Sequence, residues 1–163
     1  MENEVSSRIK TFLTFSLDKE IFAVSVSQVI NILEMTAITK IPQAPPYMLG
    51  VINLRGSVLP LVDLRIKLGM PKQEISSNTC ILVLELKSQR ELVKIGVMVD
   101  SVQEVVEIKE FDTQLSVSDR GKYNSEFIEG IANIDDNFII LLDMDILFSL
   151  DELIEISDKS EKD

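Results

Sequence analysis

Apolar and polar residues alternate along much of this chain with a period close to two. The alternation is clearest in six short segments that are rich in β-branched and aromatic residues and bounded by turn-forming residues. Such segments are typical of β-strands. They are residues 11–17, 21–26, 58–64, 80–86, 93–99 and 138–142. Several short strands joined by tight turns favour an all-β barrel or sandwich.

The second half of the chain repeats the first. Residues 50–68 (GVINLRGSVLPLVDLRIKL) align with residues 130–148 (GIANIDDNFIILLDMDILF) at an offset of 80. The identical positions are Gly50/Gly130, Asn53/Asn133, Leu61/Leu141, Asp63/Asp143 and Ile66/Ile146. Further upstream, residues 22–34 align with 95–107 at an offset of 73, and residues 12–17 with 81–86 at an offset of 69. The offset grows only where loops lengthen, as expected of a duplicated fold.

The repeat predicts two barrel-forming halves of about five strands each, spanning residues 11–69 and 80–150. Barrels this small bury little apolar surface alone. The halves should therefore pack together or exchange strands within one domain over residues 11–156, with a groove between them. The polar tails, residues 1–10 and 157–163, are expected to fray.

Three short helical segments are expected among the strands. Ser27 precedes apolar residues at helical spacing, and Asp100 does the same with Gln103 as a capping-box partner. The last segment, residues 145–157, also has apolar residues at helical spacing. Asp145 is its expected N-cap.

Composition excludes several classes of function. The 163 residues carry a net charge of −11, which repels phosphate and anionic lipid, so we expect neither nucleic-acid binding nor direct membrane insertion. Histidine is absent and Cys80 is the single cysteine, which excludes a histidine triad, a Cys/His zinc site and an intramolecular disulfide. No metal or cofactor is expected. Without a signal-peptide pattern or an apolar run of about 18 residues, we expect a cytoplasmic protein.

Asp63 and Asp143 are the most enzyme-like pair. Two carboxylates at matched repeat positions could share a proton, as in an aspartic-dyad hydrolase. Such sites need a tight glycine turn and a hydroxyl residue beside each carboxylate, but the neighbours here are Leu64–Arg65 and Met144–Asp145. We expect each aspartate to cap the turn that follows its strand, and the chain not to be an enzyme.

One turn carries a residue that the repeat does not explain. Gly56 supplies the left-handed backbone that a hairpin turn needs, and Asn53 can fix the turn through its side chain. Arg55 is different, because the duplicated turn has Asp135 in its place. The fold therefore does not require a cation there, and Arg55 is a candidate for contact with a partner.

The run Gly50-Val51-Ile52-Asn53-Leu54-Arg55-Gly56, followed by Val58, Pro60 and Val62-Asp63-Leu64-Arg65, resembles the signature of the CheW family. The resemblance covers roughly residues 11–155. It implies two intertwined five-stranded SH3-like barrels and a non-catalytic adaptor that links transmembrane chemoreceptors to the histidine kinase CheA. It also implies recruitment to membrane receptor arrays and association with other copies in rings. An adaptor of the same fold for another chemosensory-type kinase pathway is the alternative.

The resemblance also implies which residues meet the partners. The receptor tip would lie in the groove between the barrels, and its expected contacts are Leu13, Val26, Val29, Ile32, Arg55, Val99 and Val102. The regulatory domain of the kinase would dock on barrel ends at Tyr47, Met48, Gly50, Val51 and the loop at residues 111–128. Asn31 stands where many relatives carry an acidic residue, which puts a charge-dependent contact there in question.

Overall fold

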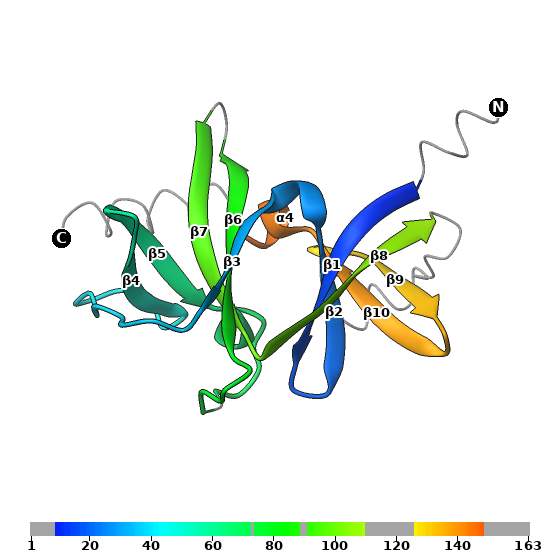
Figure 1. Ribbon diagram of the computed structural model, residues 1–163, viewed down its shortest axis with the longest axis horizontal. Coiled ribbons are helices and arrows are strands. Elements are labelled where there is room, and N and C mark those ends of the chain that lie inside the picture. The colour runs from blue at the N-terminus through cyan, green and yellow to red at the C-terminus, as the bar shows by residue number, and fades with distance from the viewer. Residues whose placement is uncertain (1–8, 73, 89–90, 110–125, 149–163) are drawn as a thin grey trace.

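Ten strands form two five-stranded sheets that stand side by side in the computed structural model (Figure 1). The structure describes residues 9–72, 74–88, 91–109 and 126–148, and this count refers to them. The strands are β1 (Ile9–Leu17), β2 (Glu20–Ser25), β3 (Val29–Glu34), β4 (Met48–Leu54), β5 (Ser57–Asp63), β6 (Cys80–Ser88), β7 (Glu91–Val99), β8 (Ser101–Lys109), β9 (Ile128–Ile134) and β10 (Asn137–Leu142). Three single-turn helices join them: η1 (Val26–Gln28), α2 (Leu64–Lys67) and α4 (Met144–Leu147).

Each sheet takes strands from both halves of the chain. The first sheet has the order β8-β1-β2-β10-β9 and the second has the order β3-β6-β7-β5-β4. Within each sheet, one parallel pair joins a strand of the first half of the chain to a strand of the second half: β2 with β10, and β5 with β7. The two pairs match in the repeat, because Ala23 lies opposite Leu141 and Gly96 lies opposite Leu61. The prediction of two intertwined, pseudo-two-fold-related SH3-like barrels is confirmed. Among the described residues, the edge strands of a sheet do not pair with each other, so each barrel is open.

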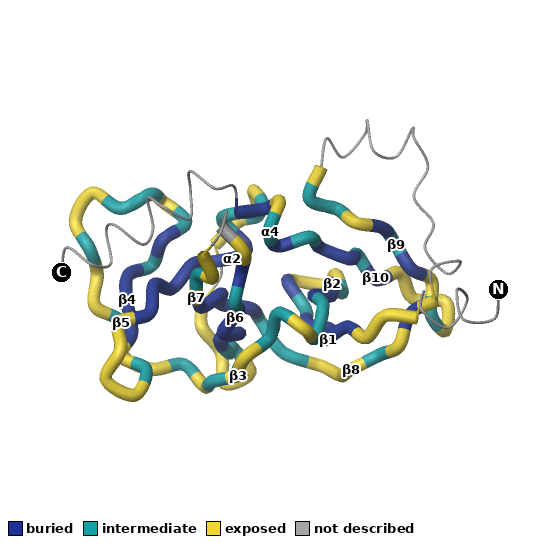
Figure 2. The backbone as a smooth tube through the Cα atoms, turned by 90° about the horizontal axis from the view of Figure 1, so that it is seen from above, coloured by how far each residue is buried: buried dark blue, intermediate teal, exposed yellow. Residues whose placement is uncertain are grey.

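Three apolar cores follow from this arrangement. The facing surfaces of the two sheets share a central core that includes Phe15, Leu82 and Val97, while the outer faces enclose two smaller clusters. The middle of β6, from Ile81 to Leu84, is covered on both faces and is fully buried. Each such side chain contributes about 1.5–3 kcal/mol through burial. Figure 2 shows the buried central strands, with exposed positions concentrated along β3 and β8.

Matching β-bulges bend the two edge strands. In β3, Val29 lies opposite Leu84 and Ile32 lies opposite Leu82. In β8, the repeat partners of these residues behave in the same way, because Val102 lies opposite Phe15 and Val105 opposite Leu13. A bulge inserts one extra residue, so residues three apart come to the same face of the strand.

The helical expectations need three corrections. Residues 101–109 form strand β8 instead of a helical turn, because the bulge produces the apolar spacing that suggested a helix. Near Ser27 only the three residues of η1 are helical, and β3 follows directly. Helix α4 is capped by Asp143 and not by Asp145.

Several expectations fall outside the described residues. These are the C-terminal tail, the part of the predicted last helix after residue 148, and residues 111–125 of the expected kinase-docking loop. At the other end, β1 already begins at Ile9, inside the predicted N-terminal tail.

Candidate partner-binding site

The β4–β5 hairpin presents Arg55 to solvent. Arg55 and Gly56 have φ values of 52° and 85°, so the backbone is left-handed at two successive residues, as in a type I′ turn. The Asn53 side-chain oxygen accepts a hydrogen bond from the Gly56 amide at 2.8 Å. Asp135, the repeat partner of Arg55, has the same φ of 52°. The turn geometry is thus independent of the charge it carries.

An apolar strip runs along the two bulged edge strands, which cross the same face of the molecule (Figure 1). We define this edge strip as Val29 and Ile32 of β3 with Val102 and Val105 of β8. Val29 and Val102 are partly buried against the central core, whereas Ile32 is 46% exposed and Val105 58% exposed. The neighbouring Val26 of η1 is also partly buried against that core. The edge strip offers apolar contacts from both barrels at once.

Two of the expected receptor contacts lie in the interior instead. Leu13 is 5% exposed and Val99 only 1% exposed, and both belong to the central core. The expectation that they contact the receptor is therefore wrong, and both are packing residues of the core that a partner cannot reach without opening the fold. The sequence expectation did not include Val105, which the structure adds to the exposed part of the edge strip. The internal repeat indicates this residue, because Val105 aligns with Ile32 at the offset of 73.

Asn31 has a local role at the β3 bulge. Its side-chain oxygen accepts a hydrogen bond from the Ile32 amide at 2.8 Å. A bulge leaves a backbone group without its ladder partner, and the Asn31 side chain satisfies this one. An amide at this position therefore holds the bulge that orients Ile32.

Three of the four expected kinase contacts are also buried. Met48 and Val51 belong to the central core, and Gly50 is buried next to them. Val51 exchanges two backbone hydrogen bonds with Thr39, of 2.8 and 2.9 Å. Gly50 has a φ of 145°, and a Cβ atom there would lie 2.2 Å from the Thr39 carbonyl oxygen. Gly50 and Val51 thus let the segment around Thr39 lie against β4, which is a structural role.

Tyr47 is half-buried at the start of β4. The Lys67 Nζ lies 4.6 Å from the centroid of its ring and 5.6 Å from that of Phe148. The Tyr47 carbonyl also accepts a hydrogen bond of 2.7 Å from the Asp63 amide. Of the four residues expected to meet the kinase, Tyr47 keeps part of its side chain accessible.

Asp63 and Asp143 each cap a helix, as expected. The Asp63 Oδ1 accepts from the Arg65 amide at 3.0 Å and the Asp143 Oδ1 from the Ile146 amide at 3.1 Å. Burial raises the pKa of Asp63. The hydrogen bonds from the Arg65 and Ile66 amides and the positive charges of Arg65 and Lys72 lower it, but burial outweighs them. Each carboxylate accepts from an amide of the helix that follows it, which is the geometry of two separate caps.

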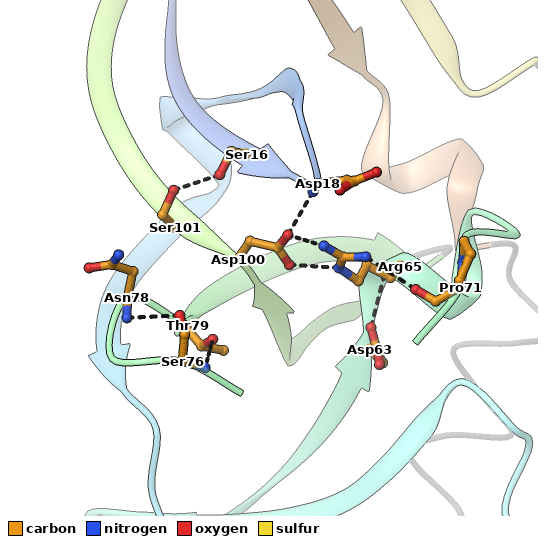
Figure 3. Close-up of polar contacts among 10 residues, drawn as sticks. All are labelled: Ser16, Asp18, Asp63, Arg65, Pro71, Ser76, Asn78, Thr79, Asp100 and Ser101. Atoms are coloured by element: carbon orange, nitrogen blue, oxygen red, sulfur yellow. Dashed lines mark hydrogen bonds and ion pairs between the residues drawn. The ribbon is translucent and has the colours of Figure 1, made fainter. Parts of the chain in front are cut away.

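A partly buried ion pair fastens the two sheets near Asp63 (Figure 3). The Arg65 side chain, 5% exposed, donates from Nε to the Asp100 Oδ1 at 2.7 Å and from Nη2 to the Asp100 Oδ2. It also donates from Nη1 to the Pro71 carbonyl at 3.2 Å. The Asp18 amide, in the β1–β2 turn, donates to the Asp100 Oδ2 at 2.6 Å. We call this cluster the Arg65 corner.

The electrostatics of the Arg65 corner follow from these contacts. Burial works against ionisation of Asp100, but the hydrogen bonds from Arg65 and the Asp18 amide outweigh it and lower its pKa. The hydrogen bond to Asp100 likewise raises the pKa of Arg65. Within the described residues, the Asp63 Oδ2 is buried without a hydrogen-bond partner. The contacts of the Arg65 corner therefore favour the ionised forms of both Arg65 and Asp100, as in a structural ion pair.

The match to known proteins is extensive. The model of the CheW-like domain matches residues 11–152. The chain belongs to the CheW family. Chemotaxis protein CheW of Rhizobium meliloti (strain 1021) is 32% identical over 143 residues, which cover 88% of this chain and 90% of that protein. CheW of Thermotoga maritima is 34% identical over 82% of this chain and 83% of its own length.

A solved CheW structure agrees with the architecture. The crystal structure of scaffolding protein TtCheW from Thermoanaerobacter tengcongensis superposes with a TM-score of 0.73 at 33% sequence identity. The match covers 88% of this chain and 94% of that chain. The CheW fold, two open barrels joined by strand exchange, thus carries the edge strip and the Arg55 turn.

Two further observations bear on the kind of site this CheW-family chain offers. In the part of the chain that the structure describes, no three cysteine, histidine or acidic side chains are grouped so that they could hold a metal ion. No helix in that same part is both long and apolar enough to cross a bilayer.

Proposed function

We propose that this CheW-family chain is a non-catalytic cytoplasmic adaptor that couples chemoreceptors to the histidine kinase CheA in membrane receptor arrays. The observation that carries the proposal is the edge strip, an apolar surface built from equivalent strands of two barrels. An apolar face that spans two rigid barrels suits the apolar side of a helical hairpin, such as the cytoplasmic tip of a receptor.

The receptor contact rests on a subset of the residues expected from sequence. Ile32 and Val105 supply exposed apolar area, while Val26, Val29 and Val102 support them from the core. The Arg55 side chain is exposed on the β4–β5 hairpin and available to an acidic group. We assign Tyr47 to the kinase side, and other copies of this chain to ring-forming contacts.

The direct test is co-sedimentation with receptor-containing membranes, with and without the kinase. Ile32→Asp and Val105→Asp should each weaken receptor binding about tenfold or more, because each places a charge in an apolar contact. Arg55→Glu should weaken it as well.

The matched control is Phe138→Asp on β10. Phe138 is 60% exposed, close to the exposure of Val105, but lies off the edge strip. It should sediment like the wild type. If Ile32→Asp and Val105→Asp also sediment like the wild type while circular dichroism shows an intact fold, the edge strip is not the receptor site.

A further inference from the structure

The edge strip is followed by the same charged residue in both barrels. At the offset of 73, Glu34 of β3 aligns with Glu107 of β8. Within the aligned segments, residues 22–34 and 95–107, every other identical pair is a pair of valines. Burial explains the valines, which belong to the central core or pack against it. The glutamates are exposed, so packing does not require the same residue in both copies.

Strand pairing places each glutamate on the same face as an exposed residue of the edge strip. Ile32 and Glu34 are two residues apart on β3, with regular pairing to β6 between them. Val105 and Glu107 are related in the same way on β8, which pairs with β1. Side chains two residues apart share a face of a strand, so each carboxylate follows the apolar side chain by about 7 Å along the strand. The intervening residues pack against the two outer clusters and are Leu33 and Val106.

The two glutamates lie at opposite ends of the edge strip. In the view of Figure 1, β3 runs toward the left of the molecule and β8 toward the right. Val29 and Val102 come first along the two strands and pack against the central core, whereas the glutamates come last and are exposed. The surface therefore has an apolar middle with one negative charge at each end.

These two charges restrict which partners the apolar surface accepts. A carboxylate at the rim of an apolar contact attracts a cation and repels another acid, so it discriminates between partners that share the same apolar face. A helical hairpin has two antiparallel helices, and each helix can turn one basic side chain toward one barrel. Such a hairpin matches the two repeated glutamates.

We propose that Glu34 and Glu107 are specificity-determining contacts of the edge strip, and that each receives a lysine or arginine that flanks the apolar face of the helical partner. This inference rests on the proposed function, because it takes the edge strip as the receptor site. It adds a charge requirement to that site. A helical partner with the same apolar face but acidic flanks is rejected.

The test is receptor co-sedimentation, corrected for binding to receptor-free membranes. Glu34→Gln and Glu107→Gln should each weaken binding about twofold to fivefold, the range expected from loss of an exposed ion pair. Glu34→Lys and Glu107→Lys should each weaken it about tenfold, since repulsion replaces attraction. Raising the salt from about 0.05 M to about 0.5 M should weaken binding of the wild type more than that of the double glutamine variant.

The matched control is Glu20→Lys, which changes the net charge by the same amount as each lysine variant. Glu20 is exposed on the β1–β2 hairpin. It lies opposite Leu17 at one end of β1, and Glu107 lies near the other end of that strand. Glu20→Lys should bind the receptor like the wild type. An equal loss in this control means that binding follows the overall charge, and the proposal is then wrong.

The failure of this inference is distinguishable from that of the proposed function. If Ile32→Asp and Val105→Asp lose binding while both lysine variants keep it, the receptor site stands and its charge requirement is wrong. If the two aspartate variants bind like the wild type, the receptor site is wrong and this inference fails with it.

Exposed charges on edge strands can also prevent edge-to-edge pairing between copies. Gel filtration of the glutamine variants measures this effect. Variants that self-associate and still bind the receptor like the wild type would assign Glu34 and Glu107 to that role and contradict the proposal. Circular dichroism confirms folding of each variant.

Discussion

The Arg65 corner and the pocket beside Asp143 and Asp145 occupy matching positions in the two repeats, yet their polar side chains differ. The first is closed by an arginine of the chain and joins the β1–β2 turn of one sheet to the end of β5 in the other. The second is an open pocket whose lining includes Glu85, Asp143, Asp145 and Lys87. The apolar positions preserve the frame in both copies, so the polar side chains are free to differ. In one repeat they form the Arg65–Asp100 ion pair, and in the other they line an open pocket.

The largest expected contrast comes from removing the arginine at the first copy. Arg65→Met should lower the free energy of unfolding by about 3–5 kcal/mol, because it leaves the partly buried Asp100 carboxylate and the buried Asp63 without their cation. At the matching position, Asp145→Ala removes one hydrogen bond to an amide and should cost about 1 kcal/mol. Urea unfolding of both variants measures the difference. Equal losses would mean that the Arg65 corner does not fasten the sheets.

A smaller effect should come from the partner of Arg65. The folded-state pKa of Asp100 is lowered, so its contribution to stability is complete above the unfolded value of about 3.9 and is lost as pH falls through the folded value. Asp100→Asn should therefore cost about 1–3 kcal/mol at pH 7 and less at pH 3. Urea unfolding across pH 3–7 provides the measurement, and a cost that is constant over this range would contradict the ion pair.

Asp63 should show the opposite pH dependence. Burial raises the folded-state pKa of Asp63. Its ionisation therefore lowers the free energy of unfolding as pH rises from the unfolded value of about 3.9 through the folded value. Asp63→Asn keeps a good N-cap residue and removes this loss, so stability at pH 7 should change by less than about 1 kcal/mol in either direction. The same urea series should show a steeper rise in stability toward neutral pH in this variant than in the wild type. A flatter rise than that of the wild type would refute the burial argument.

The smallest effect on stability is expected at the paired hairpin turns. Arg55→Asp gives the β4–β5 turn the residue that the β9–β10 turn already has at the same φ. It should change the free energy of unfolding by less than about 0.5 kcal/mol, since aspartate tolerates the left-handed region. Receptor co-sedimentation should fall nonetheless. A variant that is destabilised without losing receptor binding would make Arg55 a turn residue only.

The strand pattern and the repeat were readable from the chain alone. Period-two alternation, the matched Gly50 and Gly130, and the turn at Asn53 and Gly56 are local signals that report which side of a strand faces an apolar core. The capping roles of Asp63 and Asp143 were also predictable, because a cap depends on the next few residues. These signals, with the run around Arg55, sufficed for the fold and the CheW resemblance.

Long-range contacts decided the rest. The spacing of Val102 and Val105 suggested a helix, and only the pairing of β8 with β1 revealed a bulge. Leu13 and Val99 looked available to a partner until strand exchange placed them between the two sheets. Arg65 and Asp100 lie 35 residues apart, and no local pattern links them. The apolar period specifies which face of a strand is buried, but which strands meet, and which charges meet with them, depends on how the two halves exchange strands.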